Sequence, residues 1–321
     1  MDVICIGMSV VDVLARGVTD VPHDGSTVFV ERVSMSAGGD ALNQAIILSR
    51  FGHAVSLMTL VGDDPQGRFL LGECAKSGVD VRGVTISRQF PTSTTVVLVG
   101  KDGERSCISQ HGGTADEYGL SDIDIGLISR GVKVVSVGSF FCSEALDTDA
   151  VPVVLKAARD AGAVTVADFV QNRPDVTATD LVEVLPLLDY VAPSMSEAVQ
   201  LTGKTLPDEA AEYLLDAGAH NVVIKLGPKG ALARNRSERI AVPSYATDVV
   251  DTTGAGDNFM AGFIHGLLRD RPLADCLQFA SATAALSVRA LGTTGGVQGL
   301  ADIEALLGRQ PLEQALPEPS R

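Results

Sequence analysis

The chain has no tryptophan, and its aromatic content is only 4%. A stacking slot for a nucleoside base is therefore hard to build, although Phe29, Phe90 or Phe140 could serve. Basic residues are also few: 25 Lys and Arg stand against 40 Asp and Glu, which gives a net charge of −15 without any basic cluster. A nucleic acid or an acidic membrane is therefore a disfavoured partner, because both attract positive patches.

Cysteine is scarce as well, since the five cysteines are scattered and contain no Cys-x-x-Cys spacing. We interpret them as reduced thiols of a cytoplasmic protein and expect no zinc site. No apolar run approaches the roughly 20 residues that span a bilayer. The N-terminal stretch, which Asp12 interrupts, is typical of a first strand rather than of a signal peptide.

Two common nucleotide-binding motifs are missing. No G-x-x-x-x-G-K-[ST] string occurs, so the chain is not predicted to carry a Walker A loop. No dinucleotide-type G-x-G-x-x-G follows the first strand-like run. The second absence argues against a nucleotide-dependent oxidoreductase on a doubly wound sheet.

What is present is an alternation of strand-like and helical runs through most of the 321 residues, of which 45% are hydrophobic. This pattern predicts an α/β fold with a mostly parallel sheet and helices on both faces. Strand-like runs are expected at 3–7, 27–35, 55–62, 94–99, 105–109, 132–138, 164–169, 190–193, 222–226, 240–243 and 249–250. Helical runs are expected at 40–51, 65–77, 147–161, 179–188, 208–217, after residue 254, and at 273–291 and 301–307.

Two regions, near 13–35 and 92–110, depart from this pattern because they look antiparallel. Residues 101–104 read Lys-Asp-Gly-Glu, which is typical of a hairpin turn. We expect these regions to form a small sheet that covers a site at the carboxyl ends of the parallel strands, where ligands of open α/β sheets bind. A single domain is expected over 1–308, and the Pro- and Glu-rich tail at 309–321 is expected to fray.

The most informative motif is the string Asp-Thr-Thr-Gly-Ala-Gly-Asp at 251–257, which opens a helical run. The step from Gly254 through Ala255 to Gly256 leaves the amides of a helix N-terminus bare, and these favour an anion such as a phosphoryl group. Asp257 beside them suits a base that takes a proton from an attacking hydroxyl. The alternative is a helix cap, which is more common for shorter fragments of this string.

The sequence Asp-Thr-Thr-Gly-Ala-Gly-Asp-x-Phe-x-Ala-Gly-Phe at 251–263 resembles the C-terminal signature of the ribokinase-like (PfkB) carbohydrate kinases. The resemblance extends from about residue 3 to 308. It implies a three-layer α/β/α sandwich with a small β-sheet lid. It also implies that Asp257 is the catalytic base and that the amides of Gly254, Ala255 and Gly256 form the anion hole.

A second motif, Ser-Ala-Gly-Gly-Asp-Ala-Leu-Asn-Gln-Ala at 36–45, resembles the family's N-terminal signature. Its glycines allow close approach of a ligand, and an amide in the first helical turn could hold hydroxyls; the alternative is an ordinary turn before a helix. Asp12, after the first strand, could accept two hydroxyl hydrogen bonds or cap a loop. The resemblance implies that the acceptor binds Asp12, Gly38, Gly39 and Asn43.

Weaker matches extend the implied site to the nucleotide and to cations. The loop at 225–230, Lys-Leu-Gly-Pro-Lys-Gly, is similar to the family's nucleotide loop, with Lys225 in place of a common Thr. The nucleotide is expected to contact Lys225, Gly227, Gly230, Thr253, Ala282 and Gly292, although Ala282 could instead serve close helix packing. The resemblance also implies a metal role for Glu197 and Asp251, with a helix-terminal acid as the alternative for Glu197.

Two further segments are departures from the family pattern. Asp168 opens a stretch similar to a D-x-N-x-R segment, in which Arg173 could touch phosphate, although the spacing is altered. Ser194 stands where the family has Asn, and Asp40 stands where ribokinases proper usually carry Lys.

The combined prediction is an ATP- and Mg²⁺-dependent sugar kinase, with K⁺ as an optional cation and a homodimer formed through the lid. Ribose or fructose is the favoured type of acceptor. A nucleoside, a 2-keto-3-deoxy sugar acid and a non-catalytic sugar-binding regulator remain alternatives. Asp40 would repel an acid, and no pair of arginines suited to a carboxylate is evident, which disfavours sugar acids.

Overall fold

A computed structural model of the protein describes residues 1–19, 26–100, 105–141, 143–170 and 176–308. The expected hairpin turn at 101–104, the expected tail at 309–321 and Arg173 lie outside these residues. None of the described helices has the length and apolar character that a membrane crossing needs.

The larger of two sheets has nine strands within the described residues. Seven of them run parallel to their neighbours, and β12 and β13 add an antiparallel edge. In spatial order the strands are β13 (Arg239–Val242), β12 (Ala231–Arg234), β11 (Asn221–Lys225), β10 (Tyr190–Val191), β9 (Val164–Phe169), β8 (Val134–Phe140), β1 (Val3–Ile6), β4 (Val55–Gly62) and β5 (Asp80–Ser87).

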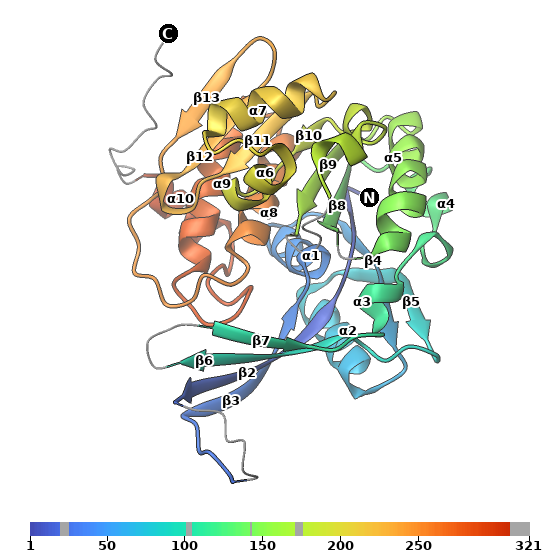
Figure 1. The fold of residues 1–321 in the computed structure, drawn as a ribbon, viewed down its shortest axis with the longest axis vertical. Coiled ribbons are helices and arrows are strands. Elements are labelled where there is room, and N and C mark those ends of the chain that lie inside the picture. Colours follow the sequence, from blue (N-terminus) through green and yellow to red (C-terminus); the bar gives the residue numbers. More distant parts are fainter. Residues whose placement is uncertain (20–25, 101–104, 142, 171–175, 309–321) are drawn as a thin grey trace.

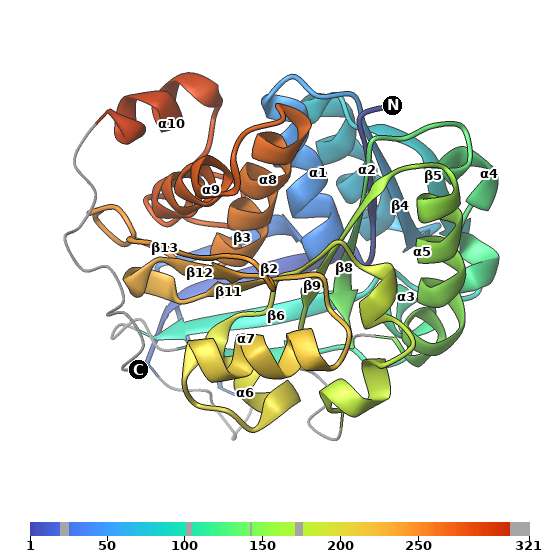
Figure 2. The same cartoon turned by 90° about the horizontal axis from the view of Figure 1, so that it is seen from above.

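Helices cover both faces of this sheet, as the alternating pattern predicts (Figure 2). Strand β1 shows the reason, because Val3 and Cys5 enter one apolar cluster while Ile4 and Ile6 enter the other. Buried side chains of the first cluster come from α1 (Asp40–Arg50), α2 (Pro65–Ser77), α8 (Ala255–Leu268), α9 (Leu273–Ser287) and α10 (Leu300–Leu307). Those of the second come from α4 (Ile125–Ile128), α5 (Val151–Asp160), α6 (Met195–Thr202) and α7 (Pro207–Asp216).

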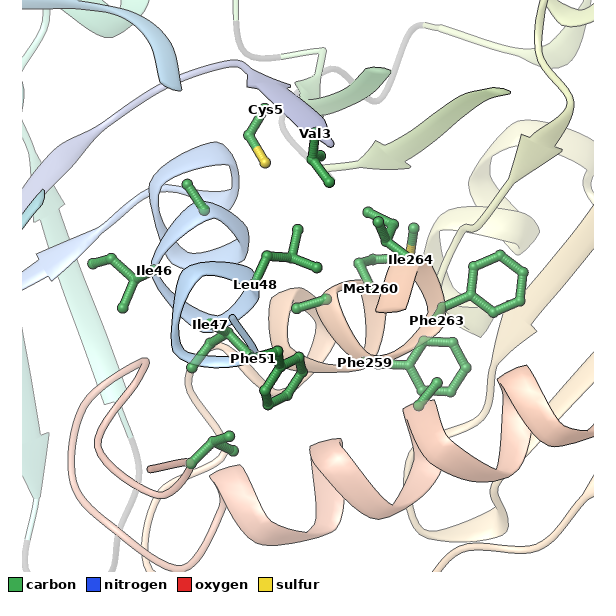
Figure 3. Packing of buried hydrophobic residues seen from close by; sticks show 14 of the residues in the cluster. Val3, Cys5, Ile46, Ile47, Leu48, Phe51, Phe259, Met260, Phe263 and Ile264 are labelled. Atoms are coloured by element: carbon green, nitrogen blue, oxygen red, sulfur yellow. The ribbon is translucent and has the colours of Figure 1, made fainter. Parts of the chain in front are cut away.

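The packing of α1 against α8 matters most for the site (Figure 3). Ile47 and Leu48 of α1 are fully buried in the same cluster as Met260 and Phe263 of α8. Each such side chain contributes about 1.5–3 kcal/mol when it is buried. This contact holds the N-terminal turns of the two helices in a fixed relation.

The smaller sheet has four strands in the order β3 (Arg32–Gly38), β2 (Val10–Val18), β6 (Thr94–Gly100) and β7 (Arg105–Ser109). Strand β2 is antiparallel to β3 and parallel to β6, and β6 is antiparallel to β7. Residues 7–9 lead directly from the carboxyl end of β1 into β2. The small sheet therefore starts at the edge where the parallel strands end (Figure 1).

Several predicted elements are wrong in detail. Residues 178–188 form two short 3₁₀ turns instead of a helix, because Pro186 cannot donate a helical hydrogen bond. Strand β3 starts at Arg32, so residues 27–31 of the expected run are not part of it. Residues 249–250 form no strand, helix α9 ends at Ser287, and strands β2, β5 and β12 were not predicted as separate strands.

Candidate active site

The string at 251–257 forms the N-terminus of α8. Gly254 is its N-cap with φ 76°, and a Cβ atom there would lie 2.8–2.9 Å from atoms of Thr293. Only glycine fits such a position without strain. The first turn that follows leaves backbone amides without intrahelical partners. The amide of Ala255 is 3.3 Å from the carbonyl oxygen of Thr252, a long contact that leaves it weakly engaged.

Asp257 lies in that first turn and contacts the first turns of α1. Asn43 Nδ2 donates a hydrogen bond of 2.6 Å to Asp257 Oδ2. Asn43 Oδ1 in turn accepts from Thr293 Oγ1 at 2.8 Å, and the same hydroxyl contacts the carbonyl oxygen of Ala37. Asn43 is 1% exposed, so its amide is fixed in orientation and holds the carboxylate of Asp257 in place.

A buried group of charges surrounds Asp257. Lys225, the last residue of β11, forms an almost fully buried ion pair with Asp168. Its Nζ lies 3.4 Å from where a Cβ of Gly256 would stand, so the ammonium faces the first turn of α8. Burial alone would lower the pKa of Lys225, but Asp168, Glu197 and Asp257 raise it overall.

The same group of charges acts on the pKa of Asp257. Burial lifts the pKa of Asp257 well above its ordinary value, and the charges of Asp40 and Asp168 lift it further. The hydrogen bond from Asn43 and the positive charge of Lys225 lower the pKa of Asp257 in part. A buried carboxyl with a raised pKa beside a helix N-terminus is a candidate for proton transfer.

Asp40 is the first residue of α1 and is part of this group. Its Oδ2 accepts a hydrogen bond of 2.9 Å from the amide of Ser139. Burial and the charge of Asp168 raise the pKa of Asp40 to about 7, against the contributions of Ser139 and Lys225. Ser139 has φ 61°, an unfavourable region for a residue with a side chain, which indicates strain next to the site.

On the other side of the site, Asp12 lies within β2, so it does not cap a loop, which was the alternative that the sequence left open. Gly38, near Asp12 on the neighbouring strand β3, has no side chain, and a Cβ atom there would overlap Asp12 Oδ2. Burial and the charge of Asp251 raise the pKa of Asp12 to about 6. Gly39 is the N-cap of α1, so the predicted acceptor residues do meet at one place.

Asp251, Thr253 and Gly292 also come together. Asp251 Oδ1 accepts from the amide of Thr253 at 2.9 Å and from its hydroxyl at 2.7 Å. Asp251 Oδ2 accepts from the amide of Gly292 at 3.0 Å. This carboxylate therefore ties the loop after α9 to the start of α8.

The remaining predicted nucleotide residues divide into two groups. Gly227 and Gly230 border the tight 3₁₀ turn that connects β11 to β12, directly after Lys225. Ala282, in contrast, is completely buried in the apolar cluster of α8 and α9. The structure thus assigns Ala282 to helix packing, the alternative that the sequence left open, and not to a surface that a base could reach.

Glu197 caps helix α6. Its Oε2 accepts from the amide of Ser194 at 2.6 Å, and Ser194 Oγ accepts from the amide of Glu197. Glu197 and Asp251 belong to separate networks. Among the described residues, no group of three or more His, Cys, Asp or Glu side chains is arranged to hold a metal ion.

Four residues at or near the site were missed in the sequence. Thr293 orients Asn43, and Asn258 Nδ2 donates to the carbonyl oxygens of Gly254 and Thr293 at 2.7 Å each. In the sequence, Asn258 and Thr293 stand directly after residues of the recognised motifs, so their positions offered a signal. Arg16 and Arg32 are paired across β2 and β3, which no sequence spacing reveals.

The chain is similar to known proteins in sequence and in fold. Residues 2–298 match the family described as pfkB family carbohydrate kinase. A ribokinase of Haemophilus influenzae is 28% identical over 291 residues, covering 88% of this chain and 92% of that protein. A 2-dehydro-3-deoxygluconokinase of Bacillus subtilis is 30% identical over 304 residues, covering 88% and 89%. The structure of Arabidopsis thaliana ribokinase complexed with ribose and ATP superposes with a TM-score of 0.84 at 25% identity, covering 96% and 99%.

Proposed function

Since the chain belongs to the pfkB family of carbohydrate kinases, and is therefore a sugar kinase acting on an alcohol group, we propose that Asp257 is its catalytic base. The observation that carries this assignment is the 2.6 Å hydrogen bond from Asn43 to Asp257 beside the bare amides of α8. Few arrangements combine a fixed carboxyl of raised pKa with a helix N-terminus that favours an anion.

In the proposed reaction Asp257 takes the proton of a primary hydroxyl of the acceptor. The acceptor oxygen then forms a bond to the γ-phosphorus of ATP, and the bond to the β-γ bridging oxygen breaks, with its electron pair leaving on ADP. The amides of Gly254, Ala255 and Gly256, with the ammonium of Lys225, stabilise the charge on the moving group. Asp12 and the backbone at Gly38 and Gly39 hold the other hydroxyls.

We assign the nucleotide to the side of the site that carries the turn at 227–230. Lys225 would meet its phosphates as a point charge. Mg²⁺ supplies positive charge to the phosphates when it is bound. Glu197, whose charge acts on Lys225, would contact such an ion through water, and the phosphates would supply its other ligands. A monovalent cation such as K⁺ would use Asp251, whose carboxylate is already oriented by Thr253 and Gly292.

The small sheet is proposed to act as a lid and as a dimer contact. Val33 and Ile108, which point away from the face of Asp12, are 63% and 61% exposed. Exposed apolar side chains gathered on one sheet face are typical of an interaction surface. A second copy of this chain is the proposed partner, and light scattering of the purified protein measures this directly.

A coupled ADP-release assay over a panel of sugars, sugar acids and nucleosides tests the proposal. Asp257→Asn keeps the side-chain volume and removes the base, so turnover should fall by about 10²–10⁴-fold. Binding of ATP, measured by calorimetry, should persist in this variant. Asp275→Asn is the matched control, because Asp275 is an exposed first-turn residue of α9. Near-normal turnover of Asp257→Asn would exclude Asp257 as the base.

A further inference from the structure

A cavity of about 560 Å³ lies between the small sheet and the loops that carry Asp251 and Gly292. It starts beside the predicted acceptor residues, because Ser36, the cross-strand partner of Asp12, is part of its wall. It extends along the small sheet to Arg16 and Arg32. The cavity therefore borders the acceptor side of the site through Ser36, while Asp251, Thr253 and Gly292 form another part of its wall.

The strand register brings two arginines together at the far end of this cavity. Arg16 of β2 is directly opposite Arg32 of β3, just as Asp12 is opposite Ser36. Side chains separated by an even number of residues share a sheet face, so both arginines lie on the face of Asp12. Four residues separate Arg16 from Asp12, which is about 13 Å along the strand.

The charges of this pair are not balanced by the described part of the protein. Both arginines are exposed, and no ion pair joins either of them to a described carboxylate. The other charged residues of the cavity wall are Glu31 and Asp251. Asp251 is already engaged by Thr253 and Gly292.

Like charges directly opposite each other on neighbouring strands are unfavourable. An anion between the two guanidinium groups would reverse this effect, and each group can offer paired N–H donors to a phosphate or a carboxylate. The net charge of −15 makes such a local concentration of positive charge unusual for this chain.

We propose that this cavity binds the far end of the acceptor, and that Arg16 and Arg32 recognise an anionic group there, a phosphate or a carboxylate. This proposal rests on the proposed function, because Asp12 and Asp257 define the other end of the acceptor. It names the acceptor as an anionic sugar derivative, whose charged end lies opposite the hydroxyl that receives the phosphoryl group.

The test compares neutral and anionic acceptors in the ADP-release assay. Fructose is paired with fructose 6-phosphate, and ribose is compared with 2-keto-3-deoxygluconate. Arg16→Gln and Arg32→Gln should each raise KM for the anionic acceptor about tenfold or more, since each removes a charge-assisted hydrogen bond. The value of kcat and the use of neutral sugars should change less than about threefold. Arg16→Lys should restore part of the affinity because it keeps the charge.

Arg82→Gln is the control for loss of one positive charge, since Arg82 is an exposed residue of the edge strand β5. If fructose 6-phosphate is preferred over fructose, the subsite binds a phosphate. If 2-keto-3-deoxygluconate is preferred over ribose, the subsite binds a carboxylate. Preference for a neutral sugar, or equal losses on both kinds of acceptor in the Gln variants, would overturn the subsite.

Calorimetric binding of the same acceptors without ATP separates this proposal from the kinase assignment. Arginine-dependent binding with no ADP release from any acceptor would contradict Asp257 as the base while keeping the subsite. ADP release that is insensitive to both arginines would contradict the subsite while keeping the base. Melting temperatures of the variants close to that of the wild type show that they are folded.

Discussion

Two regions of this molecule differ in how deeply their charged side chains are buried and in whether these side chains are paired. Around Lys225 the charged groups are largely buried and joined by hydrogen bonds and an ion pair, and the pKa values of Asp40, Lys225 and Asp257 are raised. On the small sheet the two arginines are exposed and have no described carboxylate partner. The first arrangement is suited to a reaction that needs fixed groups, and the second is suited to a charge that arrives with a ligand.

The difference has a structural basis. The buried group is attached to β9, β11, α1 and α8, all of which belong to the packed nine-stranded body. The arginines lie on a sheet of four strands that has no helix layer of its own (Figure 1). The proposed roles therefore place chemistry and acceptor recognition on separate elements.

After Asp257→Asn, the largest effect is expected for Lys225→Met, which removes the only cation of the described buried group. Turnover should fall by about 10²–10³-fold, as for loss of a donor to the transition state. Stability should also fall by about 3–5 kcal/mol, because Asp168 would be left buried without its partner. Turnover is measured by ADP release, and stability is measured by urea unfolding.

The double variant Lys225→Met with Asp168→Asn distinguishes the two effects. It should recover much of the stability, because no uncompensated charge remains, but it should recover no turnover. Lys76→Met, on the exposed face of α2 and away from the site, should change neither quantity by more than a small amount. Full activity in the double variant would show that Lys225 is only a structural cation.

A smaller effect is expected for Asp40→Asn, which keeps the contact with Ser139. The pKa of Asp40 is about 7 in the folded protein and 3.8 ordinarily, so between these pH values the folded state holds the extra proton. Stability from this group therefore falls as pH rises from about 4 to 7. The variant should be more stable than the wild type at pH 8, on the order of 1–3 kcal/mol, with no such gain at pH 4.

The same substitution should alter catalysis in a defined direction. Asp40 raises the pKa of Asp257, so its removal should move the acidic limb of the kcat/KM profile to lower pH. Asp275→Asn should leave the profile unchanged. A shift to higher pH would mean that the two carboxyls do not interact as the structure indicates.

The smallest effect on turnover is expected on the outer face of the small sheet. Val33→Glu and Ile108→Glu should convert the proposed dimer into a monomer in light scattering, because a charge would be buried at the contact. Turnover per chain at saturating acceptor should change less than about twofold. If the wild-type protein is a monomer, the proposed dimer is wrong, but the proposed roles of the two charged regions do not change.

The sequence predicted elements of both sheets where a local signal exists, including β7 at its observed bounds, and it missed β5 and β12 of the larger sheet. Strands β4 and β9 and helix α2 were predicted at their observed bounds, because buried apolar runs and caps are local signals. The glycine-rich start of α8 was recognised for the same reason. Strand β2 was missed, since a half-buried strand with Asp12 and Arg16 in it lacks a clear apolar run.

The prediction of the site residues from the sequence was limited in the same way. Asp257, Asn43 and Asp12 were predicted because motifs identify them. The pairing of Lys225 with Asp168 and of Arg16 with Arg32 depends on which strands are neighbours and in what register. Such contacts between distant segments leave no local pattern, so only the structure could reveal them.

The most direct test of the central claim is a crystal structure with the acceptor that the panel identifies and a non-hydrolysable ATP analogue. The account predicts that the primary hydroxyl of the acceptor lies about 2.6–3.2 Å from an oxygen of Asp257, at the first turn of α8. A hydroxyl that instead contacts Asp40 or Asp168, with Asp257 turned away from the acceptor, would contradict it.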